Sequence, residues 1–510
     1  MARNREPIYA GVAAASVTLI VGALFAWLGI LNGDEGWYGL AAQAIGRGQL
    51  PYRDFALVQG PVYPTLLAPF VLLWPSILMT RALSVFMMAA AVGILIYVAW
   101  RIGGRVVGLF CCAALLATIP SLPYWLSITK TYALCFLLLS IIIYLLIGGP
   151  KPQIGYPAAA LVAVVLVATR TTGIAIAIPL IGALILRAPD RLTRWRIAII
   201  TTVASLPLAV LLVFQWERLR WSLYDYHKLS LEPMHGFGKY LDRSIGAARA
   251  WPGPIFLGCV ALAVALCDPQ LRAILRRRLD LTALAVGFVL FVLLHQSGAM
   301  FFTEEYLSPL IAILLVGSCI ILLRYSGRPG ANVRWSVSHK LRMILIFGIA
   351  LTAVTGGHSD FLGAPGWKGS VSGLDQIIRC IKNNSTSNDT VFAMNLEEVV
   401  LQSHRRPVSG VSLGVFSLQD IAKQKAQDLR IMNNELLVNT FVNRPPKVLV
   451  LTPFDFSSLS RGGWFSDHFI DQRPLQAQLR NYRQVCSKTV ERNVFDNKKI
   501  KVLIFARISP

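Results

Sequence analysis

Two adjacent carboxylates begin the stretch of this chain that is best suited to chemistry. Asp34 and Glu35 follow directly on a long apolar run, and a helical pattern from Glu35 to Ile45, closed by glycines, comes after them. A further acid, Asp54, follows in the same segment, and aromatic side chains surround all three. A carboxylate at such a place can accept the proton of a substrate hydroxyl, which is the role of a general base. The alternative interpretation is structural, because an aspartate at a helix N-terminus also caps the helix.

Three basic residues stand near the same membrane edge, apart from the basic clusters of the chain: Arg53, Lys130 and Arg170. Lys130 lies between two apolar stretches, and Arg170 divides the apolar stretch 157–186, which predicts two short helices or a hairpin with Arg170 at its tip. A cation between apolar helices is costly, so we expect these charges to belong to a functional site. The alternative is that the long side chains reach the lipid headgroups.

A second polar cluster lies beside a later apolar run and contains Glu304, Glu305 and Tyr306. We expect one of its carboxylates to contact a substrate. His295 precedes the cluster, and packing within the helices is the favoured interpretation for that side chain. The aromatic segment 217–251 predicts an amphipathic cover that lies along the membrane.

Membrane helices must position these residues. The chain has 510 residues, of which 55% are hydrophobic and only 15% charged, and its mean hydropathy is +0.57. Soluble proteins carry roughly 25% charged residues, and the apolar residues here form runs of the length that crosses a bilayer, about 20 residues. A soluble enzyme is therefore excluded. We expect about eleven crossings, near Ala10–Ile30, 81–100, 106–122, 131–148, 157–169, 171–186, 197–216, 252–267, 281–301, 306–323 and 342–357.

The net charge of +23 at pH 7 follows the same topology. Arginines gather in alternate loops, at 101–105, 187–196, 272–278 and 324–342. Cytoplasmic loops carry such an excess, so we expect the N-terminus inside and the C-terminus outside. The charge is then a signal of topology, and we expect no nucleic-acid partner.

The sequence changes character after residue 357. Residues 358–510 alternate helical and strand patterns, which predicts a small soluble α/β domain outside the membrane, attached to a membrane domain at 1–357. The apolar run Val448–Leu451 predicts a buried strand. Cys380 and Cys486 could form a disulfide in an oxidising compartment. The expected elements of the tail are helices at 375–383, 418–441 and 474–482 and strands at 390–394, 447–452, 484–490 and 501–508.

The first outer loop, 31–80, resembles that of a known family. The acidic pair, the stretch Gly-Gln-Leu-Pro-Tyr-Arg-Asp-Phe at 48–55, and Gly60-Pro61 before the next apolar helix look like the GT-C superfamily of membrane glycosyltransferases. The nearest members are protein O-mannosyltransferase-like bacterial enzymes, including the aminoarabinose and galacturonic acid transferases that modify lipopolysaccharide. The layout of the whole chain resembles that family, and Thr169–Gly173 and Glu305–Pro309 resemble its late-helix patterns. The chain departs from the aminoarabinose branch at Val58–Pro61, where that branch has Glu-Lys-Pro-Pro.

This resemblance implies that the donor is a sugar on a polyprenyl phosphate and that Asp34 is the general base. The acceptor oxygen would attack the anomeric carbon in one inverting step, which needs a single carboxylate near the nucleophile. We expect Glu35 to orient the loop or a hydroxyl. The residues that we expect to bind substrate are Glu35, Arg53, Asp54, Lys130, Arg170, Glu304, Glu305 and Tyr306.

We therefore expect an inverting, polyprenyl-phosphate-sugar-dependent hexosyl- or pentosyltransferase of the bacterial cytoplasmic (inner) membrane, acting on a glycolipid, polysaccharide or protein outside the cytoplasm. The alternative is a transporter or flippase for lipid-linked sugars, which should show repeated halves and broken helices at matched positions. The sequence has no clear repeat. It also has no metal-ligand spacing and no phosphate-binding glycine loop, so we expect no required cofactor, and a divalent cation stays an open option.

Overall fold

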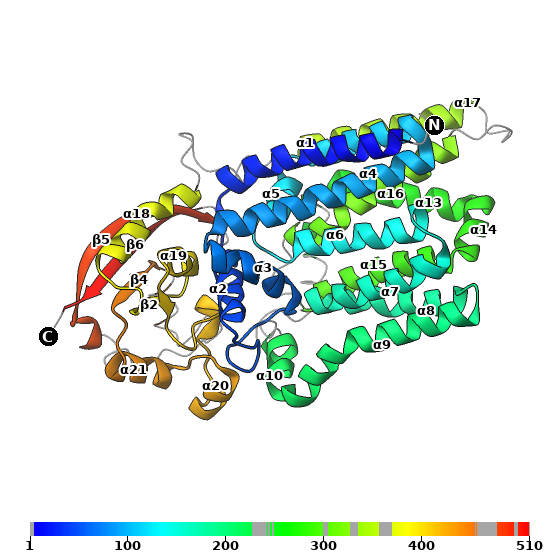
Figure 1. Ribbon diagram of the computed structural model, residues 1–510. Helices are drawn as coiled ribbons and strands as arrows, with labels where there is room; N and C mark the ends of the chain where they lie inside the picture. Colours follow the sequence, from blue (N-terminus) through cyan, green and yellow to red (C-terminus); the bar gives the residue numbers. More distant parts are fainter. Residues whose placement is uncertain are drawn as a thin grey trace.

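A bundle of apolar helices forms one side of the molecule and a mixed sheet the other, in the computed structural model of the chain (Figure 1). The structure describes residues 5–226, 249–298, 304–326, 335–355, 370–453, 477–493 and 498–508, with the single residues 242, 245, 246, 455 and 459. The predicted fold class, a polytopic helical membrane protein with an α/β tail, is confirmed. The predicted boundary at 357 lies outside the described residues.

Each of the eleven predicted crossings overlaps a helix. The bundle contains α1 (Glu6–Leu28), α4 (Ile77–Leu116), α5 (Ser121–Ser127), α6 (Tyr132–Ile143), α7 (Pro152–Thr169), α8 (Ile174–Arg187), α9 (Arg191–Phe214), α13 (Pro252–Cys267), α14 (Pro269–Arg277), α15 (Leu279–Gly298), α16 (Ser308–Ser326) and α17 (Trp335–Thr355). By length and composition, five described helices can cross a membrane, or up to seven if each bent helix pair is one span. The chain therefore crosses a membrane several times, and the number eleven stays a prediction. Gly104 breaks α4 with a φ of +74°, a backbone conformation that glycine adopts readily.

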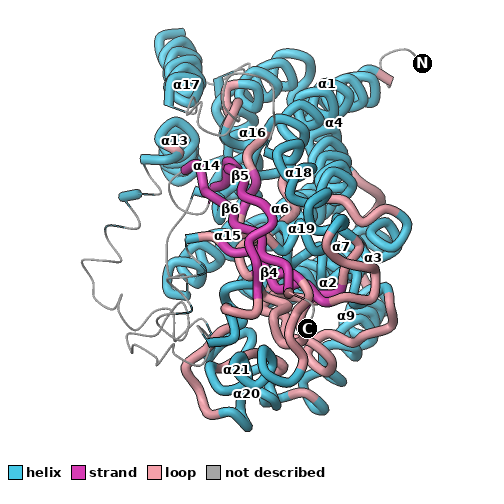
Figure 2. The backbone as a smooth tube through the Cα atoms, turned by 90° about the vertical axis from the view of Figure 1, so that its left-hand side faces the viewer, coloured by secondary structure: helices cyan, strands magenta, loops and turns pink. Residues whose placement is uncertain are grey.

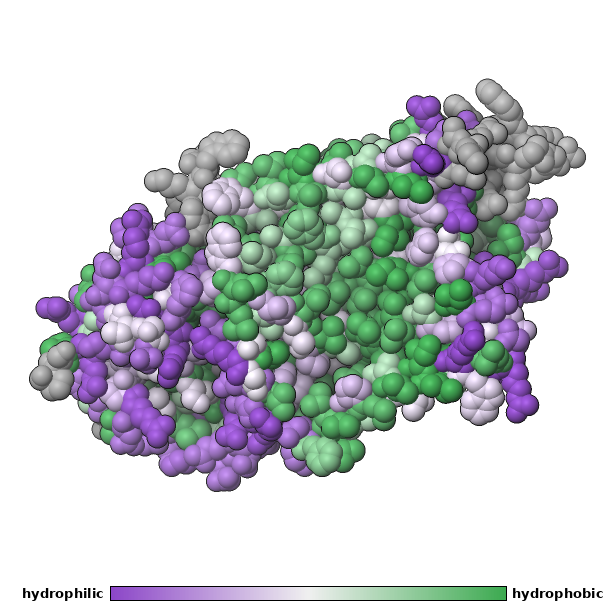
Figure 3. Space-filling model, in the orientation of Figure 1, coloured by the Kyte–Doolittle hydropathy of each residue, from purple (hydrophilic) through white to green (hydrophobic). Residues whose placement is uncertain are grey.

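Polar surfaces border the apolar bundle at both ends. Figure 3 shows a hydrophobic band over the helices, with hydrophilic side chains over the sheet region and at the opposite end. At that opposite end, arginines join neighbouring loops: Arg101 donates to the Gly148 carbonyl at 2.5 Å, and Arg278 donates to the Leu146 carbonyl at 2.8 Å. The N-terminus lies at this basic end and the C-terminus beyond the sheet (Figure 1). The loops at 101–105, 187–196 and 272–278 thus gather at one end of the bundle, as the charge pattern predicts.

The first outer loop fills the space between bundle and sheet (Figure 1). It contains α2 (Glu35–Gly46), at the place where the sequence predicts a helix, and α3 (Val62–Leu73). A two-residue strand, β1 (Leu31–Asn32), precedes α2.

Five strands of the tail and one strand of this loop form a single sheet, which Figure 2 shows as one continuous ribbon of strands. The strands of the tail are β2 (Thr390–Ala393), β3 (Arg406–Pro407), β4 (Val448–Leu451), β5 (Tyr482–Asn493) and β6 (Lys498–Arg507), and the order is β1-β5-β6-β4-β2-β3. β1 pairs in parallel with β5, Leu31 opposite Arg492 and Asn32 opposite Asn493. The sheet thus joins the predicted membrane domain to the predicted tail domain.

The predicted buried strand is confirmed as β4, which has apolar neighbours on both faces. Val448 and Val450 belong to the large core that also contains residues of α18 (Ser370–Asn383), whereas Leu449 and Leu451 face a second core with residues of α21 (Asn434–Asn443). Burial on both faces explains why the strand is apolar without alternation.

A disulfide joins Cys380 of α18 to Cys486 of β5. This is the pairing that the two tail cysteines allow, and it fastens the helix to the face of the sheet.

The tail differs from the prediction in three elements, one of which is the two-residue strand β3. The single helix predicted at 418–441 is two helices, α20 (Lys423–Leu429) and α21, because Arg430 adopts a left-handed φ of +61° and the Asn433 side chain then caps α21 by accepting from the Leu436 amide. A helix at α19 (Glu397–Ser403) is not predicted at all. Most of the helix predicted at 474–482 lies outside the described residues.

Candidate active site

A lysine between two carboxylates forms the centre of the candidate site. The Lys130 Nζ lies 2.8 Å from Asp34 Oδ2 and 2.8 Å from Glu305 Oε2. Lys130 stands in the sharp bend between α5 and α6, where the two helix axes differ by 102°, and Glu305 stands in the short helix at Glu304–Leu307. Three segments that are far apart in the sequence thus bring opposite charges together. Lys130 is buried and ion-paired, so its side chain does not extend to the headgroups.

Of the two carboxylates that contact Lys130, that of Asp34 is the more exposed. Its side chain is 32% exposed, against 8% for Glu305. Asp34 stands at the N-cap position of α2, but its side chain makes no capping hydrogen bond. The capping interpretation therefore does not account for this residue, and its carboxylate faces Lys130 instead.

Arg170 brings a second cation to the same place. It lies at the turn between α7 and α8, as the predicted hairpin requires, and is 5% exposed. Its guanidinium donates to the Thr131 hydroxyl at 2.9 Å and lies over two aromatic rings, 4.9 Å from the Tyr132 centroid and 5.5 Å from the Tyr306 centroid. The rings hold the guanidinium by cation–π attraction without neutralising its charge. Tyr306, predicted to bind substrate, therefore positions Arg170.

A glycine allows the first outer loop to approach this turn closely. A Cβ on Gly60 would lie 2.1 Å from the Ala168 carbonyl oxygen, which is a clash with backbone. Gly60 and the end of α7 can be in contact only because no side chain intervenes. The Gly-Pro of the sequence pattern thus fixes the distance between the loop and Arg170.

Two buried tyrosines complete the wall around Asp34. Burial raises the pKa of Tyr38 well above its ordinary value, which the Arg170 and Lys130 charges oppose and the Asp34 charge reinforces. Burial also raises the pKa of Tyr226, and the Asp34 charge adds to that shift. Both phenols therefore stay protonated at neutral pH.

A fully buried ion pair between Glu35 and Arg81 anchors the first outer loop to the bundle. The Glu35 carboxylate accepts from Arg81 at 2.8 and 2.5 Å, and from the backbone amides of Asn32 and Thr129 at 2.9 Å each. Arg81 also donates to the carbonyls at the end of α1, those of Ala26, Gly29 and Ile30, at 3.0, 2.9 and 2.8 Å. Because both side chains are 0% exposed, this geometry does not support the expectation that Glu35 binds substrate. It supports the other expected role, orientation of the loop.

Arg53 and Asp54 lie in an exposed turn and pair with each other at 2.8 Å. Asp54 also accepts from the Leu50 amide, and these hydrogen bonds lower its pKa to about 2. The hydrogen bonds of both side chains thus lie within the turn itself. The Arg53 carbonyl instead accepts from Arg218 and Arg430, which connects the turn to the second outer segment and to the tail.

Some predicted residues lie outside the described part of the chain. The structure gives the backbone of Glu304 but not its side chain, and the same holds for His295. The predicted cover at 217–251 is described to residue 226, with α10 (Trp216–Arg220) and a π-helical turn at Trp221–Asp225. Sequence reasoning missed Arg81, although an arginine at the edge of an apolar run is a signal of a buried charge that needs a partner.

The Lys130 ammonium occupies the space between the two described carboxylates of the cluster. Within the described residues, no group of three histidine, cysteine or acidic side chains lies close enough to bind a metal. The two carboxylates that could contribute, Asp34 and Glu305, have the Lys130 ammonium between them, in the position that a cation would take. No step below is therefore assigned to a metal.

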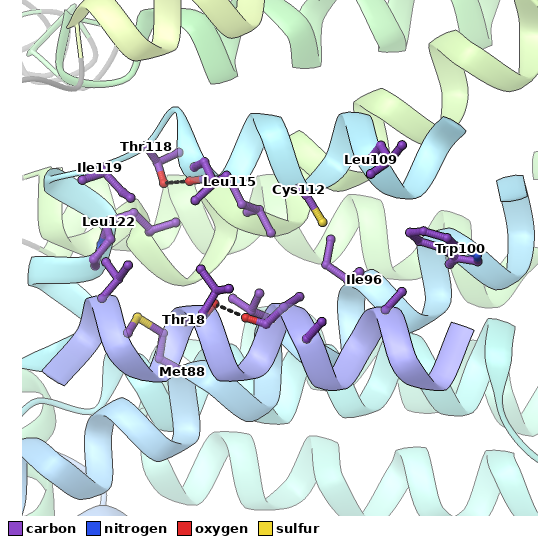
Figure 4. Close-up of a pocket in the computed structure, with 18 of the residues that line it drawn as sticks. Thr18, Met88, Ile96, Trp100, Leu109, Cys112, Leu115, Thr118, Ile119 and Leu122 are labelled. Carbon is purple, nitrogen blue, oxygen red and sulfur yellow. Dashed lines mark hydrogen bonds between the residues drawn. The ribbon is translucent and has the colours of Figure 1, made fainter. Parts of the chain in front are cut away.

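An apolar groove runs along α1 beside the site (Figure 4). It has a volume of about 570 Å³, and residues of α1, α4 and α5 form its walls. The hydroxyls of Thr18 and Thr118 bond to carbonyls of their own helices, at 2.8 and 2.6 Å, so little polarity remains in the groove. One end of the groove is at Leu126 of α5, the helix that immediately precedes the bend with Lys130.

Solved structures of membrane glycosyltransferases share this fold. Over 98% of this chain and 97% of that one, the structure is similar to ArnT from Cupriavidus metallidurans in the apo state, with a TM-score of 0.57 and 14% sequence identity. The same enzyme bound to undecaprenyl phosphate matches with a TM-score of 0.55 and 13% identity over 97% of both chains. An oligosaccharyltransferase from Archaeoglobus fulgidus, tethered to an acceptor peptide, matches with a TM-score of 0.50 and 12% identity over 98% of this chain and 74% of that one.

No family model and no curated protein sequence matches the chain. The likeness is therefore one of fold, and it is the GT-C fold that the first outer loop predicts.

Proposed function

We propose that this protein is an inverting glycosyltransferase that moves a sugar from a polyprenyl phosphate to a hydroxyl of an acceptor outside the cytoplasm. The observation that carries the proposal is the accessible carboxylate of Asp34 beside two buried cations, Lys130 and Arg170. Transfer from a phosphate carrier requires a base for the nucleophile and positive charge for the leaving group, and the site has both.

Asp34 accepts the proton of the acceptor hydroxyl. The hydroxyl oxygen forms a bond to the anomeric carbon of the sugar while the bond from that carbon to the phosphate oxygen breaks. A positioned base of this kind accelerates a reaction by about 10²–10⁴-fold. The Asp34 side chain is 32% exposed and is therefore open to an acceptor. The Glu305 side chain is only 8% exposed and mainly holds Lys130 in place.

Lys130 and Arg170 stabilise the leaving group, which takes the bonding electrons as a lipid phosphate. Arg170 suits this role because it is buried beside the bend that carries Lys130 and donates to the Thr131 hydroxyl, so a second positive charge lies close to the first. Fixed charges in a buried site act more strongly than in water, because little solvent must reorganise around them.

The apolar groove suits the hydrocarbon chain of the lipid carrier. Most side chains along the groove are apolar, and its end at Leu126 is next to the segment that carries Lys130. A chain in the groove would keep the phosphate at the level of the site.

The fold supports the same assignment. Structures of similar fold contain undecaprenyl phosphate in ArnT and an acceptor peptide in the archaeal oligosaccharyltransferase. We place the protein in the bacterial cytoplasmic membrane, with the basic end of the bundle inside and the sheet outside. In a transporter or flippase, charged groups would have to line a central passage. The cluster of Asp34, Lys130 and Glu305 lies instead at the start of α2 and in the bend between α5 and α6.

The test is Asp34→Asn in purified full-length protein, with radiolabelled polyprenyl-phosphate sugars as donors. The variant should lose transfer by about 10²-fold or more and still bind the donor. Asp190→Asn is the matched control, because Asp190 caps α9 at the opposite end of the bundle and should be replaceable without loss of transfer. Transfer by Asp34→Asn at the wild-type rate would refute the assignment of the base.

A further inference from the structure

A second, polar cavity lies between the second outer segment and the tail. Its volume is about 830 Å³, and its walls come from the end of α9, from α10 with the turn that follows, and from α20. Arg218 holds two of these walls together, because its guanidinium donates to the Asp428 carbonyl of α20 at 2.6 Å. The same guanidinium donates to the Arg53 carbonyl at 2.9 Å, which fixes the cavity to the first outer loop.

The charges around this cavity balance. Three cationic and three anionic side chains contribute to its walls: Arg218, Arg220, Lys425, Glu217, Asp225 and Asp428. Arg220 and Asp225 form an ion pair at 3.4 Å, and the donors of Arg218 bond to backbone carbonyls and to Gln215. An anionic ligand would meet three carboxylates and little uncommitted positive charge. A neutral ligand with many hydroxyls can donate to the carboxylates and accept from the cations.

Two tryptophans give the cavity the aromatic surface that a sugar ring needs. Trp216 is 51% exposed, so its ring face is open to a ligand. Trp221 is 2% exposed, and its indole N–H has no hydrogen-bond partner among the described residues. A buried donor without a partner costs about 1–3 kcal/mol, and a ligand oxygen in the cavity would satisfy it.

The first outer loop connects the cavity to the candidate active site. Arg218 donates to the Tyr52 and Arg53 carbonyls of the loop that also carries Asp34, and the Trp221 ring packs edge-on against Tyr226 at 5.6 Å. A molecule whose hydroxyl reaches Asp34 could therefore extend along this loop into the cavity.

We propose that this cavity binds a neutral sugar residue of the acceptor, next to the unit that receives the transferred sugar. The acceptor is then a glycan or the glycan part of a glycolipid, and this inference rests on the proposed function. Trp216 stacks against the apolar face of the sugar, and the indole N–H of Trp221 donates to one of its oxygens.

The test measures glycan binding without any transfer. Full-length Asp34→Asn protein in lipid nanodiscs is screened against an array of neutral and uronic-acid-containing oligosaccharides, and the Kd of the best neutral one is measured by saturation-transfer NMR titration. Trp216→Ala should raise this Kd at least tenfold, and Trp221→Phe, which keeps a ring but removes the N–H, should raise it several-fold. Trp195→Ala is the control, because Trp195 is equally exposed (56%) on α9 but does not contribute to the cavity.

Binding of a neutral oligosaccharide that both cavity variants weaken supports the proposal. Three results would overturn it: no neutral oligosaccharide binds, uronic-acid oligosaccharides bind better, or Trp221→Phe binds like the parent protein. The Phe variant decides the matter if Trp216→Ala does not fold. These outcomes are independent of the transfer assay, in which retained activity of Asp34→Asn would refute the base while leaving glycan binding untouched.

Discussion

Replacement of Glu35 by glutamine should destabilise the protein far more than the loss of a surface ion pair. The Glu35 carboxylate accepts four hydrogen bonds, two of them from Arg81, and neither side chain is exposed. Glutamine has nearly the same shape but leaves the Arg81 charge without its counterion, and its amide N–H groups face other donors. Removal of one partner from a buried pair costs about 3–5 kcal/mol. This is a large share of the roughly 5–15 kcal/mol that stabilises a typical protein.

The assay is equilibrium unfolding in mixed micelles, in which SDS is titrated and the helical signal is followed. Glu435→Gln is the matched control, because Glu435 pairs with Lys423 at 2.5 Å but both side chains are largely exposed. Exposed pairs contribute about 0–1 kcal/mol, so the control should unfold almost as the wild type does. Equal shifts for Glu35→Gln and Glu435→Gln would refute the reasoning.

A double-mutant cycle shows whether the pair itself is responsible. The cost of Glu35→Gln with Arg81→Gln should be smaller than the sum of the two single costs by more than about 1 kcal/mol, because the charges are removed together. Strictly additive costs would mean that the two residues act independently.

The Glu35–Arg81 pair should also make the stability of the protein depend on pH. Burial opposes ionisation of Glu35, but the Arg81 charge and the hydrogen bonds prevail and lower its pKa. An unfolded glutamate has a pKa of about 4.3. The stability that Glu35 contributes is therefore fully present above that pH and is lost as the pH falls through the lower folded value. The stability of Glu35→Gln should fall less steeply over this range than that of the wild type.

Three further predictions follow from the site, the tail and the groove. Glu305→Gln removes one of the two carboxylates that pair with Lys130. The KM for the donor should therefore fall, and kcat should fall about tenfold, which corresponds to about 1.4 kcal/mol of activation free energy. An unchanged kcat in steady-state assays would contradict this prediction. Cys380→Ser opens a disulfide between residues 106 apart, so the tail should lose about 4 kcal/mol of stability and be cleaved faster in limited proteolysis, as should the reduced wild type. Ala14→Phe narrows the apolar groove, so it should raise the KM for a donor with a long lipid chain but not for an analogue with a short one. Equal effects on both donors would exclude the groove as the binding site of the lipid chain.

The sequence predicts the charged centre of the site well because charge is rare and costly among apolar helices. Lys130, Arg170 and Glu305 stand out in the sequence for that reason, and the structure places all three together with Asp34 or its neighbours. What the sequence does not show is which acid pairs with which base. Arg81 resembles an ordinary helix-end arginine until the fold brings Glu35 to it.

Arg53 and Asp54 pair with each other in an exposed turn, and their role in substrate binding stays a prediction. One misassignment in the tail has a local physical cause. The helix predicted at 418–441 has continuous helical periodicity, yet Arg430 ends the first half in a left-handed conformation that periodicity does not reveal. Strand β1 has no local signal at all, because two residues cannot show an alternation and their partners are near the end of the chain.

The pairing of β1 with β5 also sets an order of assembly. Leu31 and Asn32 are synthesised 461 residues before their partners, Arg492 and Asn493 (492 − 31 = 461). Contacts between such distant parts of a chain form late, because closing a long loop costs conformational entropy. The loop that carries Asp34 therefore reaches its final shape only after β5 has been synthesised. A chain that stops before residue 482 lacks β5, and it should insert its helices but leave this loop without its strand partner.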